Sequence, residues 1–324
     1  MLWFKRQKPG LKAQKKKEMP DLQKGKVKVK ISGHEVIIDT GSLTAVFDKK
    51  TGAFTSLKFG GLEILERGLR INLWRSPTDN DAGGGVNSFG SQWSSSGLDQ
   101  PGFTVKKIDV FEQDKSAGID LKGVLSSKSG DIEVNTIYII HGNGDIHISN
   151  NINIPESIKT VPRIGTEWLL KVQFNHVKWY GRGPHENYID RKEGARFGVY
   201  ESLVKDLYFP YVKPQENGNR SDVFWLTIKN NKNIGLLVKG DPTFEFSATH
   251  YSLENLTKAR HTTDIEDAPF TTLNIDLRQA GLGGDNSWAP RTHPEYQLRS
   301  GKYSFSYIIR PVDFSKTTIR DLVE

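Results

Sequence analysis

Carboxylates, amides and aromatic side chains are concentrated in two long segments of the sequence, Arg75–Gln100 and Gly181–Arg220. Unstructured stretches of this length are uncommon in compact domains and often carry function. One chemistry that uses such residues is glycosidic cleavage, which requires two carboxyl groups flanking the bond. The sequence offers these acids: Asp79, Asp81, Glu186, Asp190, Glu193, Glu216, Asp264 and Asp285. Taken singly, each is more readily explained as a turn or loop acceptor, and Asp79–Asp81 has the composition of an Asx-turn cluster.

Two short motifs begin like metal or phosphate sites but do not complete them. His185 and Glu186 could open a zinc-protease motif, yet Ile189 occupies the position of the second histidine ligand. Gly83–Gly85 lacks the lysine and hydroxyl residue of a phosphate-binding loop, so we interpret it as a flexible loop. The absence of cysteine excludes disulfides, thiolate ligands and cysteine nucleophiles. We therefore expect no metal and no cofactor on this chain.

Trp288 lies within a run of small and polar residues, Gly283–Pro290. A tryptophan in a strand usually belongs to the core, whereas one in a loop can present its ring to a ligand. The indole face suits the C–H face of a sugar. From the residues alone, both positions of Trp288 stay open.

These candidate residues must be positioned by strands. Apolar and polar residues alternate over residues 27–31, which predicts a half-buried strand. The breaks Asp39–Gly41 and Lys50–Gly52 predict hairpin turns. Further strands are predicted at 36–38, 43–47, 54–59, 132–140, 146–154, 168–174, 224–228, 234–238, 244–248, 273–277 and 303–309. One short helix is predicted over Ser252–Arg260, so the pattern favours an all-β antiparallel sandwich.

The basic character of the sequence is confined to its first part. Residues 1–30 carry ten lysines and one arginine against Glu18 and Asp21, a net charge of +9, whereas the remaining residues carry −2. We interpret residues 1–25 as a basic, disordered tail rather than a nucleic-acid-binding arm. No run of apolar residues approaches the length needed to span a bilayer, and no export signal is recognisable. We expect no nucleic-acid or membrane partner and a cytoplasmic location.

Four segments of the sequence resemble successive signatures of lacZ-type β-galactosidases of glycoside hydrolase family 2. In order, these motifs are Leu73–Asp81 (LWRSPTDND), Trp179–Arg191 (WYGRGPHENYIDR), Pro210–Gly218 (PYVKPQENG) and Gly281–Pro290 (GLGGDNSWAP). The resemblance extends over about residues 29–311 and is specific, because the motifs are long and correctly ordered. It implies that residues 26–324 form the family's C-terminal domain, a large antiparallel supersandwich similar to galactose mutarotase.

The resemblance also implies roles for particular residues. Trp288 matches a tryptophan that forms part of the galactoside-binding wall, and Gly83, Gly84 and Gly85 match the start of a mobile loop at the active site. Supporting positions in the motif loops are Asp79, Asn80, Asp81, His185, Glu186, Asn187, Glu216, Asn217, Asp285 and Asn286. The family's catalytic glutamates and Mg²⁺ ligands lie in an upstream (β/α)₈ barrel, which nothing in this sequence matches.

The expected function is therefore that of a non-catalytic component of a β-galactosidase, as a small subunit or C-terminal domain. Its partner would be the catalytic barrel, which would hold the Mg²⁺ and cleave terminal β-D-galactosides such as lactose. Two alternatives belong to other classes: a free-standing carbohydrate-binding module that uses Trp288, and an aldose epimerase of the related mutarotase fold. Because a fold does not determine function, the arrangement of the site has to separate them.

Overall fold

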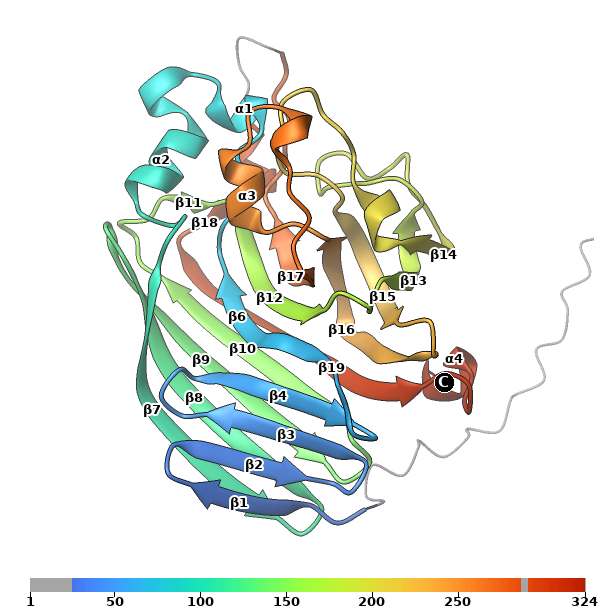
Figure 1. The fold of residues 1–324 in the computed structure, drawn as a ribbon. Coiled ribbons are helices and arrows are strands. Elements are labelled where there is room, and N and C mark those ends of the chain that lie inside the picture. Colours follow the sequence, from blue (N-terminus) through green and yellow to red (C-terminus); the bar gives the residue numbers. More distant parts are fainter. Residues whose placement is uncertain (1–24, 287–290, 324) are drawn as a thin grey trace, which may run out of the picture.

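The computed structural model describes residues 25–286 and 291–323, and the polypeptide is built mainly from antiparallel strands (Figure 1). The predicted all-β antiparallel class is confirmed. The predicted tail over residues 1–25 and the Trp288 position lie almost entirely outside the described residues, so both stay predictions.

A small sheet is formed by the first part of the chain, in the order β1-β2-β3-β4-β5. Its strands are β1 (Lys28–Ser32), β2 (Glu35–Asp39), β3 (Leu43–Asp48), β4 (Ala53–Phe59) and β5 (Leu62–Glu63). Both predicted hairpin turns are confirmed, with Gly41 and Gly52 at φ values of 87° and 70°. β1 forms where predicted, but its expected half-burial is wrong for Ile31, whose side chain is 55% exposed at the edge of the sheet.

The larger sheet has twelve strands within the described residues, and all of its pairs are antiparallel. Its strands are β6 (Leu65–Asn72), β7 (Gly102–Gln113), β8 (Ser116–Ser127), β9 (Gly130–His141), β10 (Ile146–Ile154), β12 (Arg163–Lys171), β13 (His176–Gly183), β14 (Arg196–Leu203), β15 (Arg220–Lys229), β16 (Ile234–Thr249), β17 (Phe270–Gln279) and β19 (Gly301–Asp313). A separate two-stranded ribbon pairs β11 (Thr160–Val161) with β18 (Leu298–Arg299). The small sheet packs against the curved larger sheet (Figure 1).

Short helices occupy the connections between strands. They are α1 (Asp79–Ala82), η1 (Gly85–Asn87), α2 (Phe89–Ser95), η2 (Val204–Leu207), α3 (Leu253–Lys258), η3 (Thr262–Asp264), η4 (Pro294–Tyr296) and α4 (Ile319–Val323). The predicted helix after Ser252 is confirmed, because the Ser252 hydroxyl accepts a hydrogen bond from the Asn255 amide at 3.0 Å.

The two long segments predicted to be loops contain more regular structure than expected. The segment 75–100 includes α1, η1 and α2, and 181–220 includes β14 and η2. The Asx-turn interpretation of Asp79–Asp81 is also wrong. Thr78 and Asp81 form a reciprocal capping box instead, so these residues build the helix α1.

Candidate functional site

The four motifs, far apart in sequence, meet around one cleft of about 390 Å³. We call it the motif cleft. Residues that line it from the successive motifs include Asn80, Asp190, Arg191, Gln215, Glu216 and Asp285. The sequence placed these motifs in separate loops, and the fold brings all of them to one surface.

Arg75, buried beneath the motif cleft, links the first motif to the start of the fourth. Its guanidinium is fully buried and bonds Asp81 through two parallel contacts, of 3.0 Å from Nε and 2.7 Å from Nη2. The same group donates to the carbonyl oxygens of Ala280 and Gly281. A two-point guanidinium–carboxylate pair of this kind sets orientation as well as distance. The predicted residue Asp81 is therefore a structural partner of Arg75 beneath the cleft.

The exposed residues of α1 connect the first motif to the third and fourth. The amide N–H of Asp79 donates to the side-chain oxygen of Gln215 at 3.0 Å, and the Gln215 amide donates back to the Asp79 carboxylate at 3.1 Å. The Asn80 side chain donates to the carbonyl of Leu282 at 2.9 Å. Both predicted residues thus lie on the cleft surface and hold neighbouring motifs in place.

Asp190 anchors the fourth motif to the second. One oxygen of its carboxylate accepts hydrogen bonds from the backbone N–H groups of Leu282 and Gly283, each at 2.8 Å. Gly281 leaves the space that this approach requires, because a side-chain carbon there would come within 2.9 Å of the Asp190 carboxylate. Asp190 therefore determines how the fourth motif leaves the sheet.

Glu186 joins the second motif to the third. Its carboxylate accepts from the Gly218 amide at 2.6 Å, from Arg191 at 2.5 Å and from the Tyr211 hydroxyl. His185 is exposed beside it. Glu186 thus serves as an acceptor for groups of the protein itself.

Asn187 and Asn217 stabilise the backbone behind the cleft. Both side chains are buried, and the Asn187 carbonyl oxygen accepts from the amide and hydroxyl of Ser221 at 2.9 and 2.5 Å. The Asn217 amide donates to the Gln215 carbonyl at 2.9 Å and to the Tyr251 hydroxyl at 3.2 Å. These two predicted residues are structural supports.

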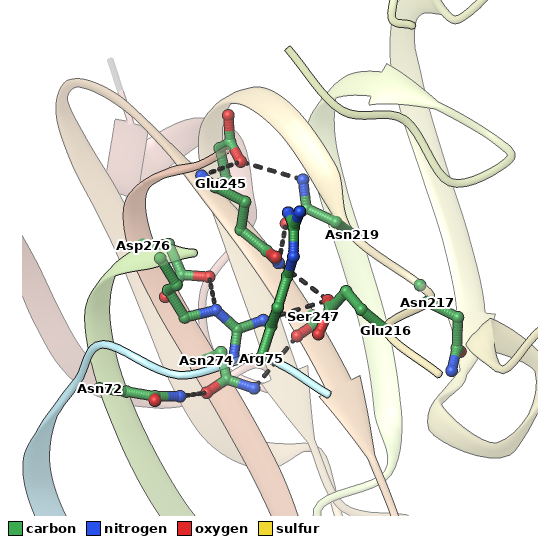
Figure 2. Close-up of polar contacts among 12 residues, drawn as sticks. Asn72, Arg75, Glu216, Asn217, Asn219, Glu245, Ser247, Asn274 and Asp276 are labelled. Atoms are coloured by element: carbon green, nitrogen blue, oxygen red, sulfur yellow. Dashed lines mark hydrogen bonds and ion pairs between the residues drawn. The ribbon is translucent and has the colours of Figure 1, made fainter. Parts of the chain in front are cut away.

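Glu216 is part of a buried charged network under the cleft (Figure 2). Its carboxylate accepts from Arg163 at 3.1 Å and from the Gln279 side chain at 2.9 Å. Arg163 also lies 3.2 Å from Asp276, an ion pair without the angle of a hydrogen bond. Burial raises the pKa of the Asp276 carboxyl well above its usual range, although the neighbouring Arg163 favours the ionised form.

Glu245 is a further buried carboxyl beside this network. It accepts from the Asn219 side chain at 3.0 Å and from the Gln279 amide at 3.1 Å (Figure 2). Burial raises the pKa of Glu245 to about 7, and those two hydrogen bonds oppose the shift without cancelling it. Burial therefore raises the pKa of two carboxyl groups under the cleft, Glu245 and Asp276.

Gly83–Gly85 leads from α1 into η1. Gly84 and Gly85 adopt φ values of 98° and 64°, whereas Gly83 has an ordinary φ of −65°. Arg291, on the far side of the fourth motif, donates to the Asn87 carbonyl and lies over the Phe89 ring at 5.2 Å. Asn87 and Phe89, which follow the glycine segment, are therefore in contact with Arg291, which follows the fourth motif.

The fourth motif contributes Asp285 to the cleft. The Asp285 carboxylate bonds the His293 ring at 2.7 Å, and this contact raises the pKa of His293. Asn286 is the last described residue before the segment that contains Trp288. The predicted sugar-facing role of Trp288 therefore falls outside the described residues.

A comparison with known families identifies the lineage of this arrangement. Residues 39–309 match the family model described as beta galactosidase small chain. The chain belongs to the beta galactosidase small chain family. This small-chain sequence is 35% identical over 272 residues to a β-galactosidase of Priestia megaterium, covering 84% of this chain and 26% of that protein. A β-galactosidase of Pseudoalteromonas haloplanktis is 31% identical over 297 residues, which cover 88% of this chain and 27% of that protein.

The small-chain match is partial with respect to these relatives, because the chain spans about a quarter of their length. Among solved structures, galactose 1-epimerase from Lactobacillus acidophilus aligns with a TM-score of 0.48 and 10% identity, covering 89% of this chain and 99% of that chain. A galactose mutarotase-like protein from Lactobacillus casei aligns with a TM-score of 0.46 and 10% identity, covering 86% and 100%.

Several residues that build this small-chain site were not singled out from the sequence. Arg75, Arg163, Gln279, Asp276 and Glu245 are all buried charged or amide residues beneath the motif cleft. Strand alternation gives no signal for Asp276, because it places this residue on the polar face of the predicted strand 273–277. In the structure residues 271–276 of β17 are all buried, so both faces of the strand are covered.

Neither a metal centre nor a membrane span was found in the part of the chain that is described. Residues 25–286 and 291–323 contain no group of three or more His, Asp or Glu side chains arranged to hold a metal ion. None of the helices within those ranges is long and apolar enough to cross a bilayer.

Proposed function

We propose that this chain is a non-catalytic component of a β-galactosidase, in which the motif cleft completes a galactoside site on a separate catalytic barrel. The observation that carries the proposal is the convergence of all four motifs on one cleft. That cleft is lined by polar groups and supported by buried pairs such as Arg75 with Asp81. A rigid polar wall of this kind suits the hydroxyl groups of a sugar.

The state of the carboxylates supports the non-catalytic part of the proposal. A retaining glycosidase needs one carboxyl group free to attack and another free to donate a proton. In the motif loops, Glu186 accepts three hydrogen bonds from the protein, and Glu216 is buried against Arg163 and Gln279. These acids are already committed to holding the loops together, so the reacting pair would come from the barrel.

The proposed substrate is a terminal β-D-galactoside such as lactose. Trp288 would supply a ring face to the sugar, and Gly83–Gly85 would belong to a segment that moves at the rim. Mg²⁺ would be held by the barrel. The resemblance of the motifs to lacZ-type enzymes is the support for these four assignments.

A chimaera tests the proposal. In the Priestia megaterium β-galactosidase, the region that this chain matches is deleted or replaced by residues 25–323 of this chain. We expect the chimaera to hydrolyse lactose and the deletion protein to be inactive. A folded chimaera, checked by circular dichroism and size, that is no more active than the deletion protein would refute the proposal.

Substitutions of Asp190 in the chimaera test whether the position of the fourth motif matters for activity. Asp190→Ala removes the acceptor of two backbone hydrogen bonds to the fourth motif, so we expect kcat/KM of the chimaera to fall about tenfold or more. The loss should lie mainly in KM, because the fourth motif would bind sugar rather than react. Asp190→Asn keeps an acceptor oxygen and should recover part of the loss, and Ile31→Ala on the exposed edge strand is the matched control. A loss confined to thermal stability would show a purely structural role.

A further inference from the structure

Exposed aromatic rings gather on the outer face of β13, β14 and β15, which lie side by side at one end of the large sheet (Figure 1). Tyr180, Phe197 and Phe224 are 37%, 48% and 40% exposed. Val199 on β14, opposite Tyr180 in the ladder, adds to the same surface. Single exposed apolar residues are ordinary, but a contiguous patch indicates a binding surface.

The rings form a continuous layer. The centroids of Tyr180 and Phe224 are 5.2 Å apart with planes inclined by 24°, and those of Phe197 and Phe224 are 6.1 Å apart. The Arg182 guanidinium lies 4.9 Å from the Phe197 ring centre. On the opposite face of β13, Trp179 is buried in the core. We call Tyr180, Phe197 and Phe224 the aromatic platform, and the core beneath makes it rigid.

A hollow of about 540 Å³, lined by both polar and apolar side chains, adjoins the aromatic platform along the same strands. Its lining includes Lys178, Glu201 and Thr227, which are opposite one another in the ladder of β14, β13 and β15. Lys178 and Tyr180 are two residues apart on β13, a distance of roughly 7 Å along a strand. Thr318 closes the hollow from the C-terminal segment. A ligand a few sugar rings long would therefore contact both the rings and the hydrogen-bonding groups.

We propose that the aromatic platform and the adjoining hollow form a second carbohydrate site, which takes an oligosaccharide. A pyranose ring offers an apolar C–H face to an aromatic ring and hydroxyl groups at its rim to charged and hydroxyl side chains. The hollow supplies the exposed charged side chains of Lys178 and Glu201 for those hydroxyl groups. Thr227 lies beneath them, buried, and its hydroxyl donates to the Lys178 carbonyl. A protein interface would instead be expected to exclude charged residues from its centre, so the composition favours a sugar.

This site is separate from the motif cleft. None of the residues lining the hollow lines the cleft, and none of the three platform residues does. The inference therefore goes beyond the proposed function and does not depend on it. Hydrolysis by the chimaera bears on the proposed function, whereas binding to the chain without any barrel bears on this site.

Calorimetric titration of the purified chain tests the site, with lactose and β-1,4-linked galactotetraose as probes. We expect galactotetraose to bind more tightly than lactose, because it covers both the platform and the hollow. Tyr180→Ala and Phe224→Ala should each weaken binding about tenfold, the scale of one lost ring contact. Tyr180→Phe keeps the ring and should bind like the unaltered chain. Ile31→Ala, which removes an exposed apolar side chain on β1, is the matched control.

Three results would overturn the proposal. The unaltered chain could give no binding heat at millimolar sugar, or binding could persist unchanged in folded Tyr180→Ala and Phe224→Ala variants. Alternatively, these variants could leave sugar binding intact and prevent the chimaera from assembling, which would assign the aromatic platform to a protein contact. Melting curves of each variant distinguish a lost ring contact from a lost fold.

Discussion

The carboxylates of Glu186 and Glu216 hold the third motif to other parts of the chain. Glu186 of the second motif accepts a hydrogen bond from the Gly218 amide, and Glu216 accepts from Arg163 in β12 and Gln279 in β17. The partner of an acid depends on contacts between distant segments, as between Glu216 and Arg163, which are 53 positions apart. Residue types were therefore predictable here, and residue roles were not.

The buried carboxyl group of Glu245 predicts how the stability of the chain depends on pH. Burial raises the pKa of Glu245 in the folded state to about 7 from an ordinary value of 4.5. A raised acid pKa means that the folded state binds more protons, so the contribution to stability is complete below about pH 4.5 and is lost as pH rises through 7. We expect the free energy of unfolding to lose roughly 3 kcal/mol from this group over that window.

Urea denaturation as a function of pH measures this effect. Glu245→Gln keeps the shape and an acceptor oxygen but cannot ionise, so its stability should vary less between about pH 4.5 and pH 7. The pKa of Asp276 is also raised, so the free energy of unfolding of Glu245→Gln should still depend on pH in part. An unchanged slope in Glu245→Gln would contradict the assignment. Glu66→Gln, on an exposed side chain, is the control.

The backbone angles of Gly83–Gly85 predict how fast hydrogen exchange occurs in this segment. Gly84 has a φ of 98°, which costs any other L-residue about 1–2 kcal/mol, whereas Gly83 has a φ of −65° that alanine adopts freely. We expect hydrogen exchange to be fast over residues 83–87, where Val86 is 85% exposed, and slower after Ser88, which caps α2.

The two alanine variants should therefore differ. Gly84→Ala should accelerate exchange over residues 83–87, and Gly83→Ala should leave exchange and the melting temperature unchanged. Equal behaviour of the two variants would show that the backbone conformation described at Gly84 is not maintained in solution. In the chimaera, Gly83→Ala should alter turnover more than folding.

Strand prediction succeeded where alternation was regular and failed where packing was unusual. β10 has the bounds predicted for it, Ile146–Ile154, because isoleucine occupies every second position except 150, where a buried asparagine stands. β8 was not predicted, since Gly118 and Gly123 occupy positions that the rings of Phe111 and Phe103 cover from β7. The sequence pattern cannot predict these ring–glycine contacts, because they form only once β7 and β8 are paired.

β16 shows a second limit of local patterns. Two strands were predicted, at 234–238 and 244–248, and the structure has one strand, Ile234–Thr249. Its first part pairs with β19 and its second part with β17. Pro242 lies between them and has no N–H to donate to a ladder. The break that the sequence pattern indicates between two strands is therefore the point where one strand changes its pairing partner.

For the whole molecule, the order of the motifs predicted the family, and the fold explains why they belong together. Segments as far apart as Asn80 and Leu282 are joined by a direct hydrogen bond at the cleft. This convergence is a tertiary property that no single motif contains. It supports a chain that shapes a site, while its acids are used to hold that shape.

The most direct test of this account is hydrolysis of o-nitrophenyl-β-galactoside by the purified chain alone. We expect a rate no higher than background at any chain concentration, because the carboxylates near the motif cleft are engaged by the protein. A rate that rises in proportion to the chain and collapses in a folded Glu186→Gln or Glu216→Gln variant would contradict it. Such a result would place the catalytic pair on this chain.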